Sequence, residues 1–261
     1  MSIFAPFAFV KEAGGGVTPT PGVVTTGLVS WYDAGDTDSY PGSGTTLYDL
    51  QGSNDLTFYQ SSVTFVSAGA SSYFTGSSAS PSLARRSGTT GIPSGKSTIS
   101  YGGWFWYNNI STFSGVLSSG IGADGVGSGG TQLMYPNTVG TTFSNQYGSD
   151  IGLVTATTTT SNNTWYHQMV TIQNTGGFNR TIKLYRQGVE VGSGTITTNV
   201  GDISTASSGP LIYVGGLGGT DINDIFYKFN GRWAVHYIYN TALTAAQVQQ
   251  NYDADKARYG Y

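Results

Sequence analysis

The sequence predicts an all-β protein that ends in one short helix. Its 261 residues include 39 glycines, 18 tyrosines, 12 phenylalanines and 5 tryptophans, whereas charged residues make up only 10%. Disordered chains combine high charge with few aromatic residues, so this composition favours a packed core. The abundant Gly, Ser and Thr supply the turns and β-branched positions of many short strands. The length suits a single large β-sandwich, so we expect one compact β domain with long loops.

Strand signals recur along most of the chain. Alternating or continuous apolar segments occur at residues 27–32, 100–107, 165–172, 181–186, 189–191, 211–215 and 232–239. The aromatic residues of 100–107 alternate as expected for a central strand buried on one face. The run from Arg186 to Val189 contains Gly188 and predicts a hairpin turn. The composition of 118–130 and 155–163 predicts loops.

The C-terminal helix has a distinct start signal. Thr244 is followed three residues later by Gln247, the spacing of a capping box in which each side chain bonds the backbone of the other residue. Leu243 and Val248 have the spacing of a hydrophobic staple. We expect the helix to continue to about Arg258 and to stop at Gly260, because glycine adopts the left-handed conformation that ends helices.

Charge and cysteine content exclude several classes of function. The net charge is −3 and Lys and Arg form no run, whereas nucleic-acid binding requires a clustered basic face. We therefore expect no nucleic-acid partner. The chain has no cysteine, which excludes disulfides, a thiol nucleophile and a Cys-ligated metal.

The N-terminus matches neither a signal peptide nor a membrane anchor. It begins with apolar residues, is interrupted by Pro6, and reaches Lys11 and Glu12 directly afterwards. A secretory signal starts with basic residues and ends in a cleavage site, and a membrane span needs about 20 apolar residues. We expect a protein that is made in the cytoplasm and does not insert into a membrane.

Composition divides the chain into an apolar N-terminal arm (1–12), a Gly/Pro linker (13–25) and a globular domain (26–261). Exposed apolar patches of this kind are avoided by soluble proteins. One alternative is that the arm is buried against another chain, and the other is that it pairs onto its own domain. In the first case the assembly residues are Phe4, Phe7, Phe9 and Val10.

Several motifs follow one another in a characteristic order. They are Asp49-Leu-Gln-Gly52-Ser-Asn54, Tyr101-Gly-Gly-Trp104-Phe-Trp106, Trp165-Tyr-His167-Gln-Met-Val170, Leu184-Tyr-Arg-Gln-Gly188 and Tyr237-Ile-Tyr-Asn240. Their order resembles the laminin-G-like members of the concanavalin A-like lectin/glucanase superfamily, in the version found in bacteriophage and bacterial surface proteins. The resemblance covers roughly residues 26–259. It implies an antiparallel two-sheet jelly-roll sandwich with one short C-terminal helix.

An acidic cluster is a candidate calcium site. Asp33, Asp36 and Asp38 lie close together in sequence, and calcium takes about six to eight oxygen ligands. The alternative is that the first two hold turns through hydrogen bonds to the backbone. Many members of the resembled family carry Asp-Glu after the Phe-Asn/Asp-Gly turn, where this chain has Trp233-Ala234-Val235. This departure counts against a calcium site carried over from the family. Apart from calcium we expect no cofactor.

Glycoside hydrolysis is the enzymatic activity that the resemblance would suggest. It needs two carboxylates, about 5–5.5 Å apart for retention of configuration and further apart for inversion. The glucanase members place them in a Glu-x-Asp-x-x-Glu strand. The only glutamates here are Glu12, in the arm, and Glu190, in a hairpin. We therefore expect no catalytic residues and no enzymatic activity.

The histidines and aromatic residues allow two interpretations each. His167 and His236 could act as a base or metal ligand, but we interpret both as hydrogen-bonded structural residues, since both lie in predicted strands. Aromatic residues could stack on sugar rings. We assign Trp104, Trp106 and Trp165 to packing, and the candidate glycan-binding residues are the loop aromatics Tyr135, Phe143 and Tyr147.

These expectations favour a non-enzymatic virion structural protein, such as a capsid decoration, fibre or tail-associated protein. The ending Lys256-Ala-Arg258-Tyr-Gly260 resembles that of phage structural proteins. Such a protein would reside in the virion, attach through its arm and display a lectin-like jelly roll. Its partners would be other virion proteins or sister subunits in a homo-oligomer, with a host surface glycan as a further candidate. The alternative is a secreted or surface carbohydrate-binding module.

Overall fold

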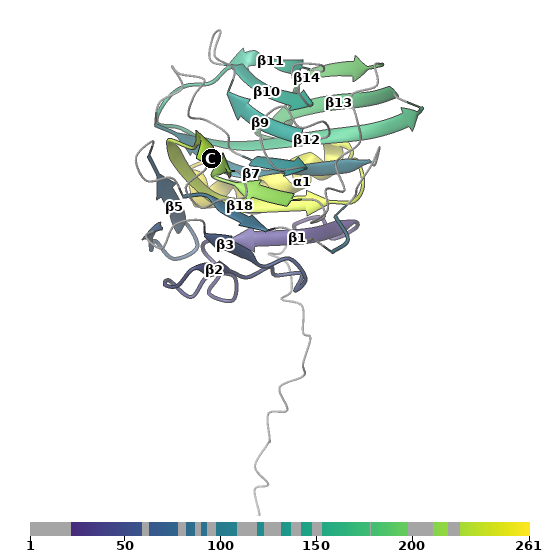
Figure 1. The fold of residues 1–261 in the computed structure, drawn as a ribbon. Coiled ribbons are helices and arrows are strands. Elements are labelled where there is room, and N and C mark those ends of the chain that lie inside the picture. Colours follow the sequence, from purple (N-terminus) through teal and green to yellow (C-terminus); the bar gives the residue numbers. More distant parts are fainter. Residues whose placement is uncertain are drawn as a thin grey trace, which may run out of the picture.

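The computed structural model describes residues 22–58, 63–77, 82–86, 90–92, 98–108, 119–122, 132–136, 142–147, 153–177, 179–197, 211–218 and 225–261. The predicted arm, with Phe4, Phe7, Phe9 and Val10, lies outside the described residues, as does the linker up to residue 21. Two facing sheets and one helix make up the fold (Figure 1). No helix in the described part of the chain has the length and apolar character needed to cross a membrane.

In the described part of the chain, eight antiparallel strands form sheet A in the order β14-β13-β12-β7-β18-β5-β4, with β1 also paired to β18. Strand β18 pairs with β7 along one side, while β5 and β1 share its other side. Strands from both ends of the domain therefore meet at the centre. The bounds are β1 Leu28–Asp33, β4 Thr64–Val66, β5 Tyr73–Gly76, β7 Ile99–Tyr107, β12 Trp165–Gly176, β13 Asn179–Arg186, β14 Val189–Ile196 and β18 Gly231–Tyr239.

Sheet B also has eight strands in the described part, in the order β11-β10-β9-β8-β15-β6-β3-β2, and β16 and β17 form a separate pair. The bounds are β2 Thr46–Leu47, β3 Leu56–Phe58, β6 Ala84–Arg86, β8 Ser119–Gly122, β9 Gln132–Pro136, β10 Thr142–Tyr147, β11 Leu153–Thr159, β15 Leu211–Val214, β16 Gly216–Gly218 and β17 Ile225–Lys228. The predicted antiparallel two-sheet sandwich with one short helix is confirmed.

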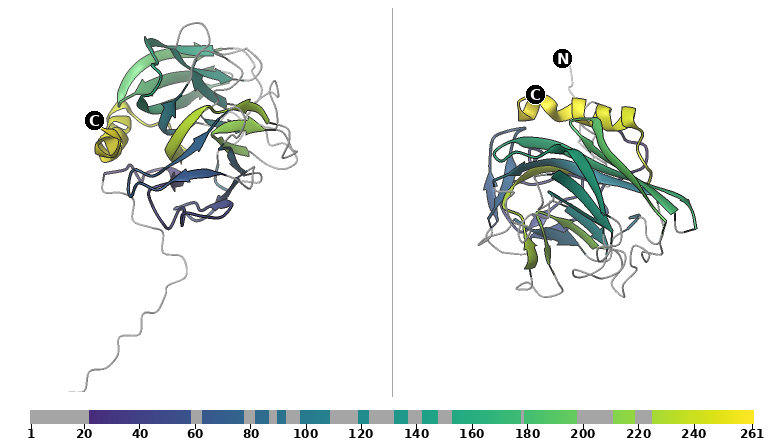
Figure 2. Two further views of the ribbon diagram at one scale, coloured as in Figure 1. Left: turned by 90° about the vertical axis from the view of Figure 1, so that its left-hand side faces the viewer. Right: turned by 90° about the horizontal axis from the view of Figure 1, so that it is seen from above.

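Two hydrophobic layers hold the domain together. The first lies between the sheets and contains Phe105 and Ile238 of sheet A with Phe58 and Ile212 of sheet B. The second lies on the outer face of sheet A, beneath the helix α1 (Ala245–Asp255), which crosses that face (Figure 2). Each fully buried large apolar side chain contributes roughly 1.5–3 kcal/mol. Sheet A is therefore the middle layer of three.

The central strand β7 is buried on both faces, which corrects the expectation of one buried face. Tyr101 and Phe105 point into the layer between the sheets, whereas Trp104 lies in the layer beneath the helix. The glycine pair at 102–103 has a steric reason. A Cβ at Gly103 would lie 1.8 Å from the carbonyl oxygen of Val235, so only glycine allows β18 to approach this closely.

The predicted loop at 155–163 is wrong over its first half. Residues Leu153–Thr159 form β11, in which Val154 and Ala156 are buried and the alternate residue Thr155 is exposed. A run of threonines was interpreted as a loop because of its polarity, but threonine is β-branched and fits a half-exposed edge strand. Likewise β8 lies within the predicted loop at 118–130.

The predicted helix and hairpin are confirmed. Thr244 and Gln247 form a complete capping box, with the Thr244 N–H donating to Gln247 Oε1 at 2.9 Å. The helix continues as a 3-10 turn, Lys256–Tyr259, and ends at Gly260 with φ 86°. The β13–β14 hairpin turns through Gln187 and Gly188, with φ 50° and 79°, the positive values that a two-residue hairpin turn requires.

Candidate functional site

A patch of partly exposed aromatic residues lies on the outer face of sheet A, beyond the C-terminal end of α1. It consists of Tyr73, Trp106, Trp165 and Tyr261, with Arg232 among them, and we call it the aromatic patch. Strand register builds it, because Thr75, Arg232, Trp106 and Trp165 lie opposite one another across four strands. Residues opposite one another on adjacent strands share a face of the sheet.

The rings of the aromatic patch contact one another. The ring centroid of Trp165 lies 5.8 Å from that of Tyr73 and 5.8 Å from that of Trp106, and both ring pairs are edge-on. Its centroid also lies 4.9 Å from that of the buried Tyr259. The Tyr261 hydroxyl donates to the backbone oxygen of Trp165 at 2.6 Å. The first three patch rings are half-buried, and Tyr261 is 45% exposed. The rings therefore hold one another in place and form a partly solvent-exposed aromatic surface.

Arg232 supplies positive charge to the aromatic patch. Its guanidinium carbon lies 4.9 Å from the Tyr73 ring centroid and 4.7 Å from that of Trp106. Such contacts are attractive because the ring faces carry negative charge. Chemically, the site offers ring surfaces for packing and a cation for polar recognition.

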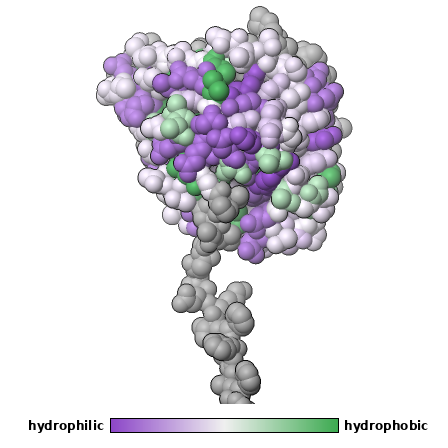
Figure 3. All heavy atoms as spheres, turned by 180° about the vertical axis from the view of Figure 1, so that it is seen from behind, coloured by the Kyte–Doolittle hydropathy of each residue, from purple (hydrophilic) through white to green (hydrophobic). Residues whose placement is uncertain are grey.

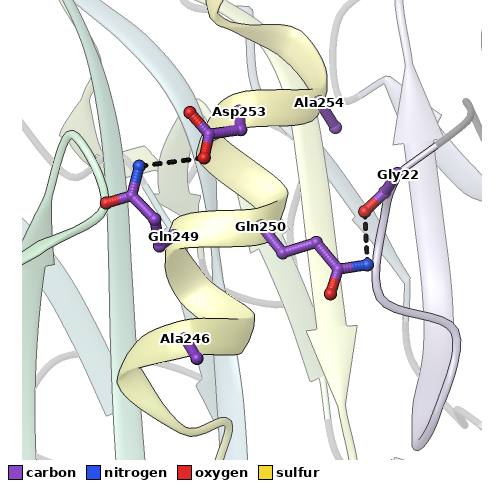
Figure 4. A pocket seen from close by; sticks show the side chains of 6 residues that line it. All are labelled: Gly22, Ala246, Gln249, Gln250, Asp253 and Ala254. Atoms are coloured by element: carbon purple, nitrogen blue, oxygen red, sulfur yellow. Dashed lines mark hydrogen bonds between the residues drawn. The ribbon is translucent and has the colours of Figure 1, made fainter.

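Two grooves flank the helix on the same side of the molecule. One, about 430 Å³, lies between Gly22 and the exposed face of α1, where Gln250 Nε2 donates to the Gly22 oxygen at 2.6 Å (Figure 4). The other, about 330 Å³, lies between β12, β13 and the N-terminal end of the helix. Hydrophilic residues gather in the middle of this face of the molecule (Figure 3). Among the described residues, the only carboxylate that lines either of these two grooves is Asp253.

The candidate calcium residues do not converge. Asp33 is buried. Its carboxylate accepts hydrogen bonds from both terminal nitrogens of Arg258, at 2.6 and 2.7 Å, and from the Gly35 N–H at 2.8 Å. Asp36 accepts the Asp38 N–H at 2.8 Å, which is the turn-forming bond of the alternative interpretation. The described residues contain no group of three or more His, Asp or Glu side chains that could hold a metal. The arrangement does not fit a calcium ion.

The Asp49–Asn54 motif is a structural turn. Asp49 Oδ1 accepts the N–H of Trp31 at 2.9 Å, and Oδ2 accepts that of Asn54 at 3.1 Å. Burial raises the pKa of the Asp49 carboxyl, and these bonds oppose the increase. Asn54 Nδ2 in turn donates to Ser30 at 2.8 Å. The motif therefore fixes β1 to the loop that follows β2.

Both histidines are structural. Burial lowers the pKa of His167 to about 3, and its ring lies 5.3 Å from Trp104 and 5.9 Å from Tyr252. Burial likewise lowers the pKa of His236 to about 3. The expectation of hydrogen bonding is wrong for the His167 ring, whose two nitrogens have no partner in the described part of the chain. Neither imidazole reaches a groove or the aromatic patch.

The three candidate glycan-binding residues lie on strands and not on loops. Tyr135 belongs to β9, and Phe143 and Tyr147 belong to β10. In the backbone pairing of these strands, Tyr135 lies opposite Ser144, and Phe143 lies opposite Pro136. The side chains of the three residues lie outside what the structure describes, so this glycan site stays a prediction.

Sequence reasoning missed the aromatic patch. The packing role expected for Trp165 is confirmed, since it packs against the outer hydrophobic layer, but Trp106 and Trp165 are also only half-buried. Arg232 received no role, because nothing in its sequence neighbourhood marks it. In the structure, Trp106 and Arg232 are the partly exposed positions of otherwise buried strands, and no motif in the sequence marks them. Only strand pairing brings residues 73, 106, 165, 232 and 261 together.

The comparisons with known proteins identify the class. Residues 84–249, more than half of the chain, match the family described as the concanavalin A-like lectin/glucanases superfamily. The chain belongs to this family. None of the curated proteins compared matches its sequence.

Solved structures show the same fold. A sialidase from Trypanosoma rangeli, solved with sialic acid, has a TM-score of 0.62 at 14% identity, over 92% of this chain and 35% of the sialidase chain. The protein thus spans about a third of that enzyme. Domain 4 of an extracellular arabinanase from Geobacillus stearothermophilus, solved with arabinotriose, has a TM-score of 0.59 at 17% identity, over 86% of this chain and 97% of that domain. The botulinum neurotoxin serotype C1 binding domain has a TM-score of 0.57 at 13% identity, over 87% and 52%.

Proposed function

We propose that this protein is a non-enzymatic glycan-binding protein whose sugar site is the aromatic patch. The observation that carries the proposal is the pair Trp106 and Trp165, held half-exposed and side by side on adjacent strands. One face of a sugar ring presents C–H groups that pack on aromatic surface, and the sugar hydroxyls need polar partners nearby. Arg232 offers such a partner within the same patch. The lectin-type fold and the arabinotriose complex of the similar arabinanase domain support this proposal.

The absence of catalysis is part of this proposal. Glu190, one of the two glutamates of the chain, is bound to Lys183 at 2.9 Å on an edge strand. Asp33 and Asp255 are buried and both pair with Arg258. Carboxylates held in this way do not offer the opposed acid and base of a glycosidase. These observations support a binding role.

A glycan array tests the sugar site. We expect the full-length protein to bind a subset of polysaccharides saturably, and the variants Trp165→Ala and Tyr261→Ala to bind about tenfold more weakly through loss of ring contact. The matched control is Tyr48→Ala, because Tyr48 is also 45% exposed but lies outside the aromatic patch. Thermal midpoints show whether each variant is folded, and Tyr261, at the chain end, is the safer change. Binding to no glycan, or equal effects at Tyr48 and Tyr261, would contradict the proposal.

The second candidate function is that of a virion structural protein, which would display this domain as a capsid decoration, fibre or tail-associated protein. The observation that favours it is where the chain enters the domain. Val23 and Val24 are buried beside α1, and the Val24 N–H donates to Asn251 at 2.9 Å. The end of the linker is thus held firmly next to the helix. We propose that the arm attaches the protein to other virion proteins or to sister subunits.

Deletion of residues 1–12 tests the attachment role. We expect the shortened protein to keep its thermal midpoint, since the described fold begins after these residues. It should lose self-association in light scattering, or incorporation into particles where these are produced. Replacement of Phe4, Phe7 and Phe9 by serine, with the arm length kept, should have the same effect. Normal oligomers or normal incorporation of both variants would place the attachment surface on the jelly roll instead.

A further inference from the structure

The cationic group of the aromatic patch has unused hydrogen-bonding capacity. Arg232 is half-buried, and its guanidinium makes no hydrogen bond or ion pair within the described part of the chain. Other arginines of the domain differ. Arg258 binds two carboxylates, and Arg186 donates to the carbonyl and hydroxyl oxygens of residues 158–160.

Two neighbouring cations, Lys256 and Arg258, are already paired with carboxylates. Lys256 lies over the ring of Tyr252 at 5.5 Å, but it pairs with Asp253 at 2.6 Å. Arg258 lies over Tyr259 at 5.4 Å and pairs with Asp33. Of these three cations, Arg232 is the one that no carboxylate of the described part neutralises. Arg186 also lies over a ring, that of Tyr166 at 4.6 Å, but it is buried and donates to the Thr159 and Thr160 oxygens. Arg232 is only half-buried and can therefore meet a negatively charged ligand.

The geometry of Arg232 suits a planar anion. A guanidinium has five N–H donors in one plane, and stacking on rings covers its faces while leaving the edge donors free. Two of these donors match the two oxygens of a carboxylate. Contact with the rings of Tyr73 and Trp106 also holds the side chain in place in advance, so binding orders less of it.

We propose that Arg232 selects an acidic glycan and binds the carboxylate of a uronic-acid-type sugar, while Trp106 and Trp165 pack against the sugar chain. This proposal rests on the proposed glycan-binding function and adds the ligand class and the residue that selects it. The whole protein has a net charge of −3, so its overall charge does not attract polyanions. Preference for an acidic glycan therefore has to arise from a local group.

Matched ligands test the charge requirement. Binding of the full-length protein is measured by calorimetry on acidic polysaccharides, namely galacturonan, alginate and hyaluronan, and on their methyl-esterified, uncharged forms. We expect at least one acidic form to bind about tenfold more tightly than its ester, the effect of a charge-assisted bidentate contact. A sulfated dextran serves as a non-planar anion. Equal binding of acid and ester, or tighter binding of the sulfated dextran, would overturn the proposal.

Matched variants assign the preference to Arg232. Arg232→Met keeps an unbranched stem on the rings and removes the charge, so it should weaken binding of the acid about tenfold more than binding of the ester and thereby abolish the preference for the acid. Lys256→Met is the control, and it should keep the preference because Lys256 already has a partner. Loss of acid and ester binding together in Arg232→Met would show a merely structural role and overturn the proposal. Failure of the proposed function is distinguishable, because the wild-type protein would then bind neither form.

Discussion

At the residue scale, Arg258 joins three parts of the fold that are distant in sequence. It pairs with Asp33 of β1 and with Asp255 at the end of α1, and its Nε donates to the Ala70 oxygen at 2.6 Å. Burial by itself would lower the pKa of the guanidinium, but the hydrogen bonds to Asp33 raise it above its ordinary value. Tyr237 donates to Asp255 from beneath the helix. The result is a buried network in which each charge depends on the others.

Arg258→Ala should therefore cost about 3–5 kcal/mol of unfolding free energy, because it leaves two buried carboxylates without their cation. Urea denaturation measures this change. Lys256→Ala is the matched control, since it removes an ion pair of the same helix end that is exposed on both sides, and such pairs contribute little. Comparable losses in the two variants would contradict the assigned role of the Arg258 network.

The two buried histidines predict a dependence of stability on pH. Each has a pKa of about 3 in the folded protein, against 6.5 for an unperturbed histidine. Below about pH 6.5 these histidines are protonated in the unfolded chain but not in the folded chain. The free energy of unfolding therefore falls as the pH decreases toward 3. One such histidine accounts for about 2 kcal/mol between pH 7 and pH 5.

The variant His167→Phe isolates this effect. Phenylalanine suits a ring site whose nitrogens have no described partner, so the variant should fold and lose less stability than wild type between pH 7 and pH 5. Raised pKa values of Asp49 and Asp255 act in the opposite direction, but they are common to both proteins and cancel in the difference. Identical pH profiles of the thermal midpoint in the two proteins would refute the prediction.

At the scale of elements, α1 is a cover for the outer face of sheet A. Leu243 and Val248 are buried at its start, and Asn251 bonds both Val24 and Tyr239 in its middle. The helix is short, and isolated helices of fewer than about 12–15 residues are marginal in water. Packing and end capping, more than helix propensity, keep it formed.

Thr244→Ala should reduce the unfolding free energy by about 1 kcal/mol, because it removes the side-chain oxygen that accepts the Gln247 N–H at 3.3 Å. Thr244→Ser is the matched control, since serine keeps that oxygen. Chemical denaturation of both variants checks the prediction. An equally large loss in the serine variant would show that the methyl group, and not the cap, stabilises the helix.

At the scale of the whole molecule, layer order decides which surface is free. Sheet A has sheet B on one side and α1 on the other. The helix covers the outer face only in part, and beyond its end the strands β5, β18, β7 and β12 carry the aromatic patch. The proposed site thus lies on the middle layer, where a rigid sheet fixes the positions of the rings.

The purified protein should not hydrolyse any glycan that it binds. The physical reason is the use of the described buried carboxylates in internal bonds, as for Asp33, Asp49 and Asp255. Chromatographic analysis of bound polysaccharides after prolonged incubation checks this prediction. Release of shorter oligosaccharides that a single Asp substitution abolishes would establish an enzyme instead.

The sequence by itself determined much of the architecture. Three features are local. Hydrogen bonds between neighbouring residues form the helix cap at Thr244, and backbone angles form the turn at Gly188. The alternation of aromatic residues marks β7 as a strand. The order of motifs was enough to indicate the family to which the chain belongs. The loop predicted from polarity is wrong at residues 155–159, where an edge strand keeps threonines exposed.

Only the tertiary structure decided which residues share a surface. Arg258 and Asp33 lie 225 positions apart in the sequence, yet they form an ion pair. Asp33, a candidate calcium ligand in the sequence, is therefore bound to an arginine. The aromatic patch likewise depends on the register of four strands that are far apart in the chain. Whether Trp104 or Trp106 is buried depends on where α1 ends, about 150 residues further along the chain. Long-range pairing sets exposure, and exposure separates a packing residue from a binding residue.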